Sequence, residues 1–419
     1  MASAVFQSRP YKVAKRVFDF LLAQWFFILL AVFIVLAWRW PSFAKQGGTV
    51  KAEYSIQYGA VAVIFLISGL SIKSKDLALN LGHWRAHFTV LTSSFLITSA
   101  IIYGIVSGIK ASHDGAIDDW LLVGLIVTHS CPTTVSSNVV MTKAADGNDI
   151  LTVCEVVIGN LLGAFITPAL VQMYLTGTWE FGNPTHQAGV SVKELYANVM
   201  KQIGLSVFVP IFVGQVVQNI FPKQTKWCLT TFKLNKVGSF MLLLIMYQSF
   251  STAFAQGAFT AVSHALIIFL VFFNIGIYLF FTVIVFLYSR PLFILRLFPT
   301  VPTAESSKSY TWCYKIFRPF YYNRRDTVLM MLCGPAKTAA LGVSLVSSEY
   351  GSTNSKLGIL LVPLVLYQAE QVFTAQILVK FMKKWIHAED HKPVDEESTP
   401  LADQGSKKGL DQDSTGESR

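Results

Sequence analysis

A single lysine lies in the middle of an otherwise apolar stretch in the C-terminal half of the chain. Lys337 follows Gly334 and Pro335 and precedes Thr338, within residues 326–348. A lysine at the depth of a bilayer is costly unless it is paired, so it normally faces the protein interior and an ion or substrate path. The pattern predicts that the Lys337 ammonium stands where a transporter would otherwise bind a cation. A structural salt bridge is the alternative interpretation.

Two acidic residues in other apolar stretches could balance this charge. Glu155 lies one helical turn after Thr152, so the two side chains can share a helix face. Glu370 lies beside Gln371 in the last apolar stretch. Either carboxylate could neutralise Lys337 or take part in proton movement.

A second apolar stretch is interrupted by polar residues around a proline. Residues 119–142 contain Pro132, followed by Ser137 and Asn138, and Pro335 has the corresponding place in its own stretch. Proline removes a backbone donor and clashes with the preceding turn. In lipid the freed carbonyls need partners, so such a break is tolerated only where protein buries it or where it lines a cavity. We therefore expect two broken helices, although a lone proline usually means an ordinary kinked helix.

The composition places most of the chain in lipid. Of the 419 residues, 53% are hydrophobic and only 14% are charged, whereas soluble domains average about 25% charged residues. The net charge of +10 fits basic loops on the cytoplasmic face of a membrane better than nucleic-acid binding. The chain has no phosphate-binding loop, no H-E-x-x-H motif and no spaced nucleophile set, so we expect neither an enzyme nor a cofactor. The five scattered cysteines indicate neither a zinc site nor a disulfide framework.

Ten stretches are long enough to cross a bilayer, which needs about 20 apolar residues. They are residues 20–38, 55–72, 88–109, 119–142, 150–175, 202–221, 237–256, 263–288, 326–348 and 357–380. Most of the 34 lysines and arginines then fall on the side of the N-terminus, which places both termini in the cytoplasm. In the fifth span, Gly159 and Gly163 are spaced for close helix packing.

The spans divide the chain into five segments. These are a cytoplasmic N-terminus (1–19), a first five-helix repeat (20–175), an extracellular loop (176–201), a second five-helix repeat (202–380) with a cytoplasmic loop (289–325), and a disordered acidic cytoplasmic tail (387–419). The broken spans are the fourth of each repeat. Because five crossings is an odd number, the second repeat is inverted relative to the first. Paired interrupted helices in inverted repeats are typical of secondary transporters with a site near the midplane.

Two short motifs surround the predicted breaks. Residues 131–144 read Cys-Pro-Thr-Thr-Val-Ser-Ser-Asn-Val-Val-Met-Thr-Lys-Ala, and residues 334–342 read Gly-Pro-Ala-Lys-Thr-Ala-Ala-Leu-Gly. With Gly147-Asn148 and Thr167-Pro168, they resemble the bile acid:sodium symporter family, solute carrier family 10. The resemblance covers residues 15–385. It is greatest to the branch of the seventh human member and of fungal plasma-membrane carriers tied to calcium homeostasis.

The resemblance implies a fold and a set of site residues. The fold is all-α, with a panel domain of spans 1, 2, 6 and 7 and a core domain in which the broken spans 4 and 9 cross. Movement of core against panel gives alternating access. In sodium-coupled members, a Ser-Asn pair in span 4, hydroxyls in span 5 and a Glu-x-x-x-Gln run in span 9 hold two sodium ions. Ser137 and Asn138 match the pair and Thr152 matches the first hydroxyl, so these three form a candidate sodium site.

The chain departs from the family pattern at the remaining ion ligands. Val156 lies near the second hydroxyl position and cannot ligate an ion. Cys333 stands where the family has its Glu, and Lys337 stands where it has its Gln. These departures argue against both sodium sites. Because span 5 borders the ion region in the family, Glu155 is the preferred countercharge for Lys337.

The residues and the resemblance together predict a plasma-membrane solute carrier. We expect it to move an organic anion or another small solute, and the fungal branch implies that it negatively regulates calcium influx and cytosolic calcium. The alternative is a non-transporting regulator that acts on a calcium channel or another membrane partner through cytoplasmic segments. The expected partners are the lipid bilayer and a small molecule or ion, and not nucleic acid.

Overall fold

The computed structural model describes the helical body of the chain and most of its connections. The described residues are 25–45, 47–112, 117–134, 136–176, 201, 204–255, 257, 259–260, 262–303, 306–339, 341–342, 345 and 357–390. Several predictions lie outside them, namely the N-terminal segment 1–19, nearly all of the loop 176–201, most of the second half of the ninth span, and the tail from residue 391 onward.

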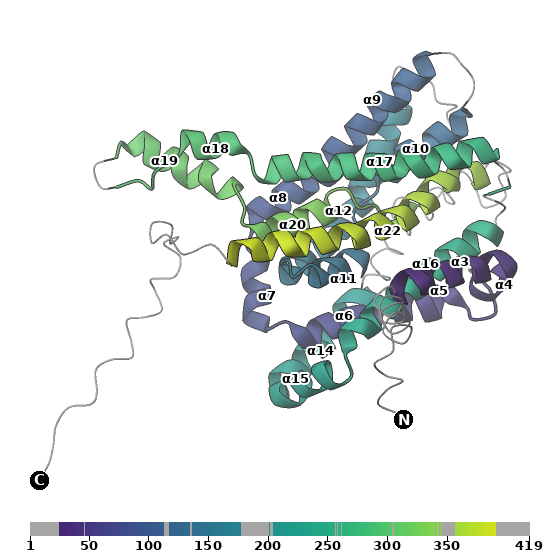
Figure 1. Ribbon diagram of the computed structural model, residues 1–419, viewed down its shortest axis with the longest axis horizontal. Coiled ribbons are helices and arrows are strands. Elements are labelled where there is room, and N and C mark those ends of the chain that lie inside the picture. The colour runs from purple at the N-terminus through teal and green to yellow at the C-terminus, as the bar shows by residue number, and fades with distance from the viewer. Residues whose placement is uncertain are drawn as a thin grey trace, which may run out of the picture.

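The first group of packed helices comes from two separate parts of the chain. Figure 1 shows it in the lower part of the view. It consists of α3 (Trp25–Arg39), α4 (Pro41–Ala44), α5 (Ala52–Tyr54), the π-helix η1 (Ser55–Ala60), α6 (Val61–Ser71), the π-helix η3 (Gly204–Phe208), α14 (Val209–Ile220), α15 (Pro222–Thr231) and α16 (Leu234–Ala255). Within it, α6 packs on α14, and α16 packs on α3.

The second group surrounds the two predicted breaks. It consists of α8 (Trp84–Leu91), the π-helix η2 (Thr92–Ile97), α9 (Thr98–Ala111), α10 (Asp119–Ser130), α11 (Ser136–Ala144), α12 (Asp149–Leu175), α17 (His264–Ser289), α20 (Arg324–Cys333) and α22 (Leu357–Asp390). The helix α7 (Ser74–Leu81) joins α6 of the first group to α8 of the second. The two groups also touch where α16 meets α11 and α22.

A helical hairpin extends from the second group between α17 and α20. It contains α18 (Leu292–Leu297), α19 (Lys308–Phe317) and the short 3-10 helix η4 (Arg318–Phe320), and it projects to the left in Figure 1. Exposed apolar side chains cover it, including Leu292, Phe293 and Trp312. The segment predicted as the cytoplasmic loop 289–325 therefore has helical structure of its own.

Helix length and apolar composition identify a multi-pass membrane protein. Within the described residues, five helices are long and apolar enough to cross a membrane, or up to seven if each of two bent pairs is one span. The bent pairs are the two halves of α12 and the α14–α15 junction, where the chain turns by 116° before Pro222. No strand occurs in the described residues, so the all-α prediction is confirmed to that extent. Ten spans in two inverted repeats stay a prediction.

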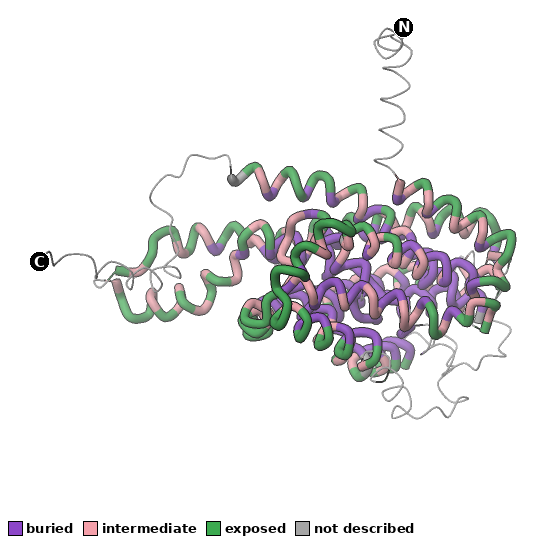
Figure 2. Tube along the Cα trace, turned by 90° about the horizontal axis from the view of Figure 1, so that it is seen from below, coloured by how far each residue is buried: buried purple, intermediate pink, exposed green. Residues whose placement is uncertain are grey.

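Burial is concentrated at the centre of the molecule, and apolar side chains also cover its outside. Figure 2 shows the buried residues gathered in the interior and the exposed ones along the outer helices. Phe272 on α17 and Phe212 on α14 are among the most exposed large side chains. Such an apolar exterior is the surface expected where lipid rather than water surrounds the helices.

The last helix is longer than the sequence indicates. The tenth span is predicted to end at residue 380 and the tail to begin at 387, but α22 continues to Asp390. Near its end, Lys383 Nζ and His387 Nε2 each lie 2.8 Å from Oδ2 of Asp146. Partial burial alone would raise the pKa of Asp146, but these two bonds outweigh burial and hold the pKa below its ordinary value. These contacts fix the extended end of α22 to the turn between α11 and α12.

Candidate functional site

Both predicted helix breaks are present, and they contact each other directly. The helix α10 ends at Ser130 and α11 begins at Ser136, while α20 ends at Cys333. The backbone N–H of Thr338 donates to the carbonyl oxygen of Pro132 over 2.9 Å. Two interruptions that are about 200 residues apart in the chain therefore meet in one place.

At the break after α10, the carbonyl groups of residues 130–133 all accept hydrogen bonds from other segments. The Ser130 oxygen accepts from Thr167 Oγ1 (2.9 Å), and the Thr133 oxygen accepts from Asn160 Nδ2 (3.1 Å). The Cys131 oxygen accepts from Lys337 Nζ (3.2 Å), and the Pro132 oxygen accepts from Thr338 as above. Interrupted backbone inside a membrane protein needs such partners, and here both α12 and the other break supply them.

The Lys337 side chain is enclosed at this meeting point. It is 1% exposed, and its ammonium donates to the backbone oxygen of Ser94 and, over 3.2 Å, to the Ser94 hydroxyl. With the Cys131 oxygen, these are its three hydrogen-bond acceptors among the described residues, and all three are uncharged. The positive charge is therefore stabilised by dipoles, including the carbonyl end of α10, rather than by a carboxylate.

The helix α22 holds the second break in place. Gln371 bonds both the N–H and the carbonyl of Lys337, each over 2.7 Å. The Gln368 side-chain oxygen accepts from the N–H of Ala339 (2.7 Å), and the Tyr367 hydroxyl donates to the Pro335 oxygen (2.8 Å). Gln371, expected as a binding residue, thus uses both ends of its amide on backbone groups.

Two of the three candidate sodium ligands belong to one polar network. Ser137 Oγ donates to Thr134 Oγ1, which donates to Asn138 Oδ1 over 2.9 Å. Asn138 Nδ2 donates to Thr133 Oγ1, and Thr133 Oγ1 donates to the Cys333 oxygen over 2.7 Å. This network links the start of α11 to Cys333 at the end of α20, where the resemblance places the family's glutamate.

Thr152, the third candidate sodium ligand, is hydrogen-bonded within its own helix. Thr152 Oγ1 donates to the Asn148 oxygen one turn earlier in its own helix, over 2.8 Å. Its side chain is fully buried, and no bond from it to Ser137 or Asn138 occurs among the described residues. The structure therefore joins the Ser-Asn pair to the crossing and leaves Thr152 bonded within α12.

The expected pairing of Lys337 with Glu155 is wrong. Oε1 of Glu155 lies 2.8 Å from Nδ1 of His87 on α8, so the carboxyl group is paired with the imidazole. Glu370, the other suggested countercharge, forms no ion pair in the described part of the chain, and its Oε2 has no hydrogen-bond partner there. The sequence could not show either result, because Glu155 and His87 are 68 positions apart and only the packing of α8 on α12 brings them together.

Close approach of α12 to the first break depends on a glycine. A Cβ atom on Gly163 would lie 2.6 Å from the ring of Pro132, whereas a Cβ on Gly159 would lie 3.5 Å from the nearest side chain. The close packing predicted from this glycine pair is therefore present, and it requires a glycine at position 163 but not at position 159.

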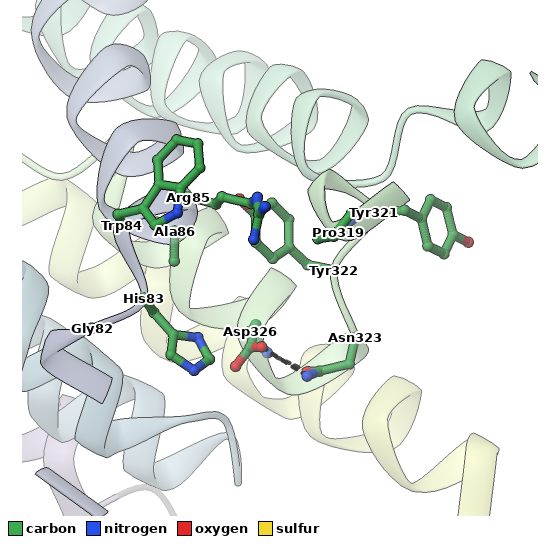
Figure 3. Close-up of a pocket in the computed structure, with 10 residues that line it drawn as sticks. All are labelled: Gly82, His83, Trp84, Arg85, Ala86, Pro319, Tyr321, Tyr322, Asn323 and Asp326. Atoms are coloured by element: carbon green, nitrogen blue, oxygen red, sulfur yellow. Dashed lines mark hydrogen bonds between the residues drawn. The ribbon is translucent and has the colours of Figure 1, made fainter. Parts of the chain in front are cut away.

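A polar cavity of about 470 Å³ opens at the start of α8. Figure 3 shows His83 and Asp326 on one side of it and Trp84, Arg85 and Tyr322 on the other. The Asp326 carboxylate accepts bonds from two asparagine amides, Asn148 and Asn323, each over 2.7 Å. These bonds tie the starts of α12 and α20 together beneath the cavity.

Several residues at the centre were not identified from the sequence. Ser94, His87, Gln368 and Tyr367 are single polar groups in apolar helices, and each bonds a backbone or charged group of another segment. Three of the four carried a signal, because a polar side chain within a span needs a partner in lipid, whereas His87 lies just before the third predicted span. The partners themselves could not be read without the fold.

Comparison with known proteins identifies related transporters. The model of the SBF-like CPA transporter family matches residues 24–384. The solute carrier RCH1 of Candida albicans is 74% identical over 404 residues, covering 96% of this chain and 98% of that protein. The solute carrier RCH1 of Saccharomyces cerevisiae is 59% identical over 377 residues, covering 89% and 86%.

A vertebrate protein is similar at lower identity. The sodium/bile acid cotransporter 7 of Danio rerio is 28% identical over 365 residues, covering 87% of this chain and 94% of its own.

The family model spans both helix groups and both breaks. The chain therefore belongs to the SBF-like CPA transporter family.

Proposed function

We propose that the protein is a plasma-membrane secondary carrier in which the Lys337 ammonium replaces a bound sodium ion. The observation that carries this proposal is the position of Lys337, whose buried ammonium donates hydrogen bonds only to uncharged oxygens of Ser94 and Cys131 among the described residues. An excess positive charge in a water-poor site favours a negatively charged solute nearby. The substrate class that fits best is a small organic anion.

The proposed transport cycle is alternating access. The division of the helices into two groups, with both breaks in the second group, supports movement of one group relative to the other. In this proposal the ten spans form two inverted repeats, and both termini lie in the cytoplasm. Ser137, Asn138 and Thr338, with Lys337, line the moving site.

Transport can be tested in reconstituted vesicles. A bile acid is the first solute to try, because a relative is named as a sodium/bile acid cotransporter. We expect wild-type uptake to be the same with sodium and with potassium, and to be lost in Lys337→Ala and reduced in Asn138→Ala. Uptake that rises steeply with sodium would contradict the proposal, as would full activity of Lys337→Ala.

We also propose that the carrier negatively regulates calcium influx, as the resemblance to the fungal branch implies. Cells without the protein should then take up more radiolabelled calcium than wild-type cells. Restoring the wild-type chain should lower uptake again, and Lys337→Ala should fail to do so if regulation depends on transport. Equal calcium uptake with and without the protein would remove this part of the proposal.

A second candidate function is a non-transporting regulator of a calcium channel or another membrane partner. The projecting α18–α19 hairpin favours it, because Trp312 is 64% exposed there and basic residues flank it. Removal of residues 391–419 and, separately, replacement of Trp312 by Ser should then abolish calcium regulation. A carrier should retain bile-acid uptake in both variants.

A further inference from the structure

His87, on α8, contacts both α12 and the end of α7. Its Nδ1 lies 2.8 Å from Glu155 Oε1 on α12, and its Nε2 lies 3.1 Å from the backbone oxygen of Leu81. Leu81 is the last residue of α7, the helix that links the two groups. The imidazole therefore ties the α7–α8 turn, at Gly82, to the second group.

The two bonds fix the number of protons on this pair. A carbonyl oxygen only accepts, so Nε2 must carry a hydrogen that it donates to Leu81. The contact between Nδ1 and Oε1 then needs a second proton, either on the imidazole or on the carboxyl group. Without that proton, a nitrogen lone pair would face a carboxylate oxygen at 2.8 Å. If the remaining proton moved to Nδ1, the bond to Leu81 would be lost instead.

We infer that His87 and Glu155 form a proton-binding site that locks the α7–α8 turn when it is loaded and releases it when it is empty. One proton from water is bound between Nδ1 and Oε1, and the same proton returns to water on release. The His87 side chain is 11% exposed and Glu155 is not exposed at all. The proton therefore enters and leaves through the imidazole.

The titratable groups around His87 and Glu155 do not compete for this proton. Arg85 stacks on Trp84 and donates to the Lys315 oxygen, and the Tyr322 hydroxyl bonds Thr89. The cysteine thiols of Cys154 on α12 and Cys333 on α20 also lie near Glu155. His83 and Asp326 belong to the adjacent cavity shown in Figure 3. No charged side chain other than His87 bonds Glu155 among the described residues, and its Oε2 has no partner there.

This site deepens the proposed function, on which its transport role rests. If the protein is a carrier, the proton is the coupling ion, because its binding alters the link between the helix groups. The existence of the proton site is independent of transport. It can therefore be tested on the full-length protein without a solute.

Hydrogen–deuterium exchange of the purified protein in nanodiscs tests the site directly. Backbone amides of residues 82–87, corrected for intrinsic exchange, should be protected at about pH 5 and exchange about tenfold faster at about pH 9, because one hydrogen bond is lost. Glu155→Gln should stay protected at both pH values, since its amide N–H can donate to Nδ1 as the bound proton does. His87→Leu should exchange fast at both.

Glu53→Gln is the matched control, because Glu53 lies in the first helix group and accepts from the Gly47 N–H. This variant should follow the wild type. Exchange of residues 82–87 that does not depend on pH in the wild type would overturn the inference, even if neither site variant folds. A pH response in Glu155→Gln equal to that of the wild type would overturn it as well. Neither result depends on whether solute uptake is detected.

Discussion

The side-chain amide of Gln371 forms a two-bond pair with the backbone of Lys337. The Lys337 N–H donates to Oε1 and Nε2 donates to the Lys337 oxygen, each over 2.7 Å. The geometry copies the pairing of neighbouring backbone strands, and it satisfies the peptide groups that a continuous helix would have bonded internally. The position of the buried ammonium thus depends on a residue of α22.

Replacing Gln371 should destabilise the protein strongly. Gln371→Met keeps the volume but leaves a buried N–H and a buried carbonyl without partners, so we expect a loss of about 2 kcal/mol or more in unfolding free energy. Thermal unfolding in detergent measures it. Gln172→Met, at an exposed position of α12, is the control and should change little. Equal stability of both variants would mean that the pair contributes nothing to the break.

The contact of α12 with the first break can be tested with two glycines in one helix. Gly163→Ala should cost about 1–3 kcal/mol, because its Cβ would lie 2.6 Å from the rigid Pro132 ring. Gly159→Ala has ordinary contact distances and should be neutral or slightly stabilising. The comparison of melting temperatures measures the difference. A reversed order would show that Pro132 does not rest on Gly163.

The ionised Asp146 carboxylate should stabilise the folded protein, and this contribution should be lost in acid. Because its folded pKa is lowered, its contribution is fully present above the ordinary aspartate pKa and is lost as the pH falls through the folded value. Asp146→Asn should remove this contribution, which partial exposure limits to less than about 1 kcal/mol. Asn also tolerates the left-handed backbone at this position, where φ is 58°. The difference in unfolding free energy between the wild type and Asp146→Asn should therefore be largest at neutral pH and should shrink as the pH falls. Unfolding curves recorded at several pH values measure it.

The sequence alone predicted the two helix breaks and the interior position of Lys337, but it did not predict which side chains contact one another. Pro132 and Pro335 located both breaks, because a proline inside a lipid-embedded helix leaves carbonyl groups that only the surrounding protein can satisfy. The high cost of a charge in lipid identified Lys337 as an interior residue in the same way. These predictions depend on local chemistry, which each segment carries by itself.

The contacts depend on which helices are neighbours, and no short motif shows that. The carboxyl group of Glu155 bonds His87 rather than Lys337, because α12 passes beside α8. The end of α22 was also placed too early, since charged residues from Lys380 onward interrupt the apolar run. Their helix is stabilised by distant partners, Asp146 for Lys383 and His387.

Binding of radioactive sodium to the purified protein tests the central claim most directly, because it needs no knowledge of the solute. If the Lys337 ammonium occupies the cation position, the wild type should show no saturable sodium binding at physiological sodium concentrations. Lys337→Gln, which removes the charge and keeps a polar side chain, should gain binding. Saturable sodium binding by the wild type would contradict the account.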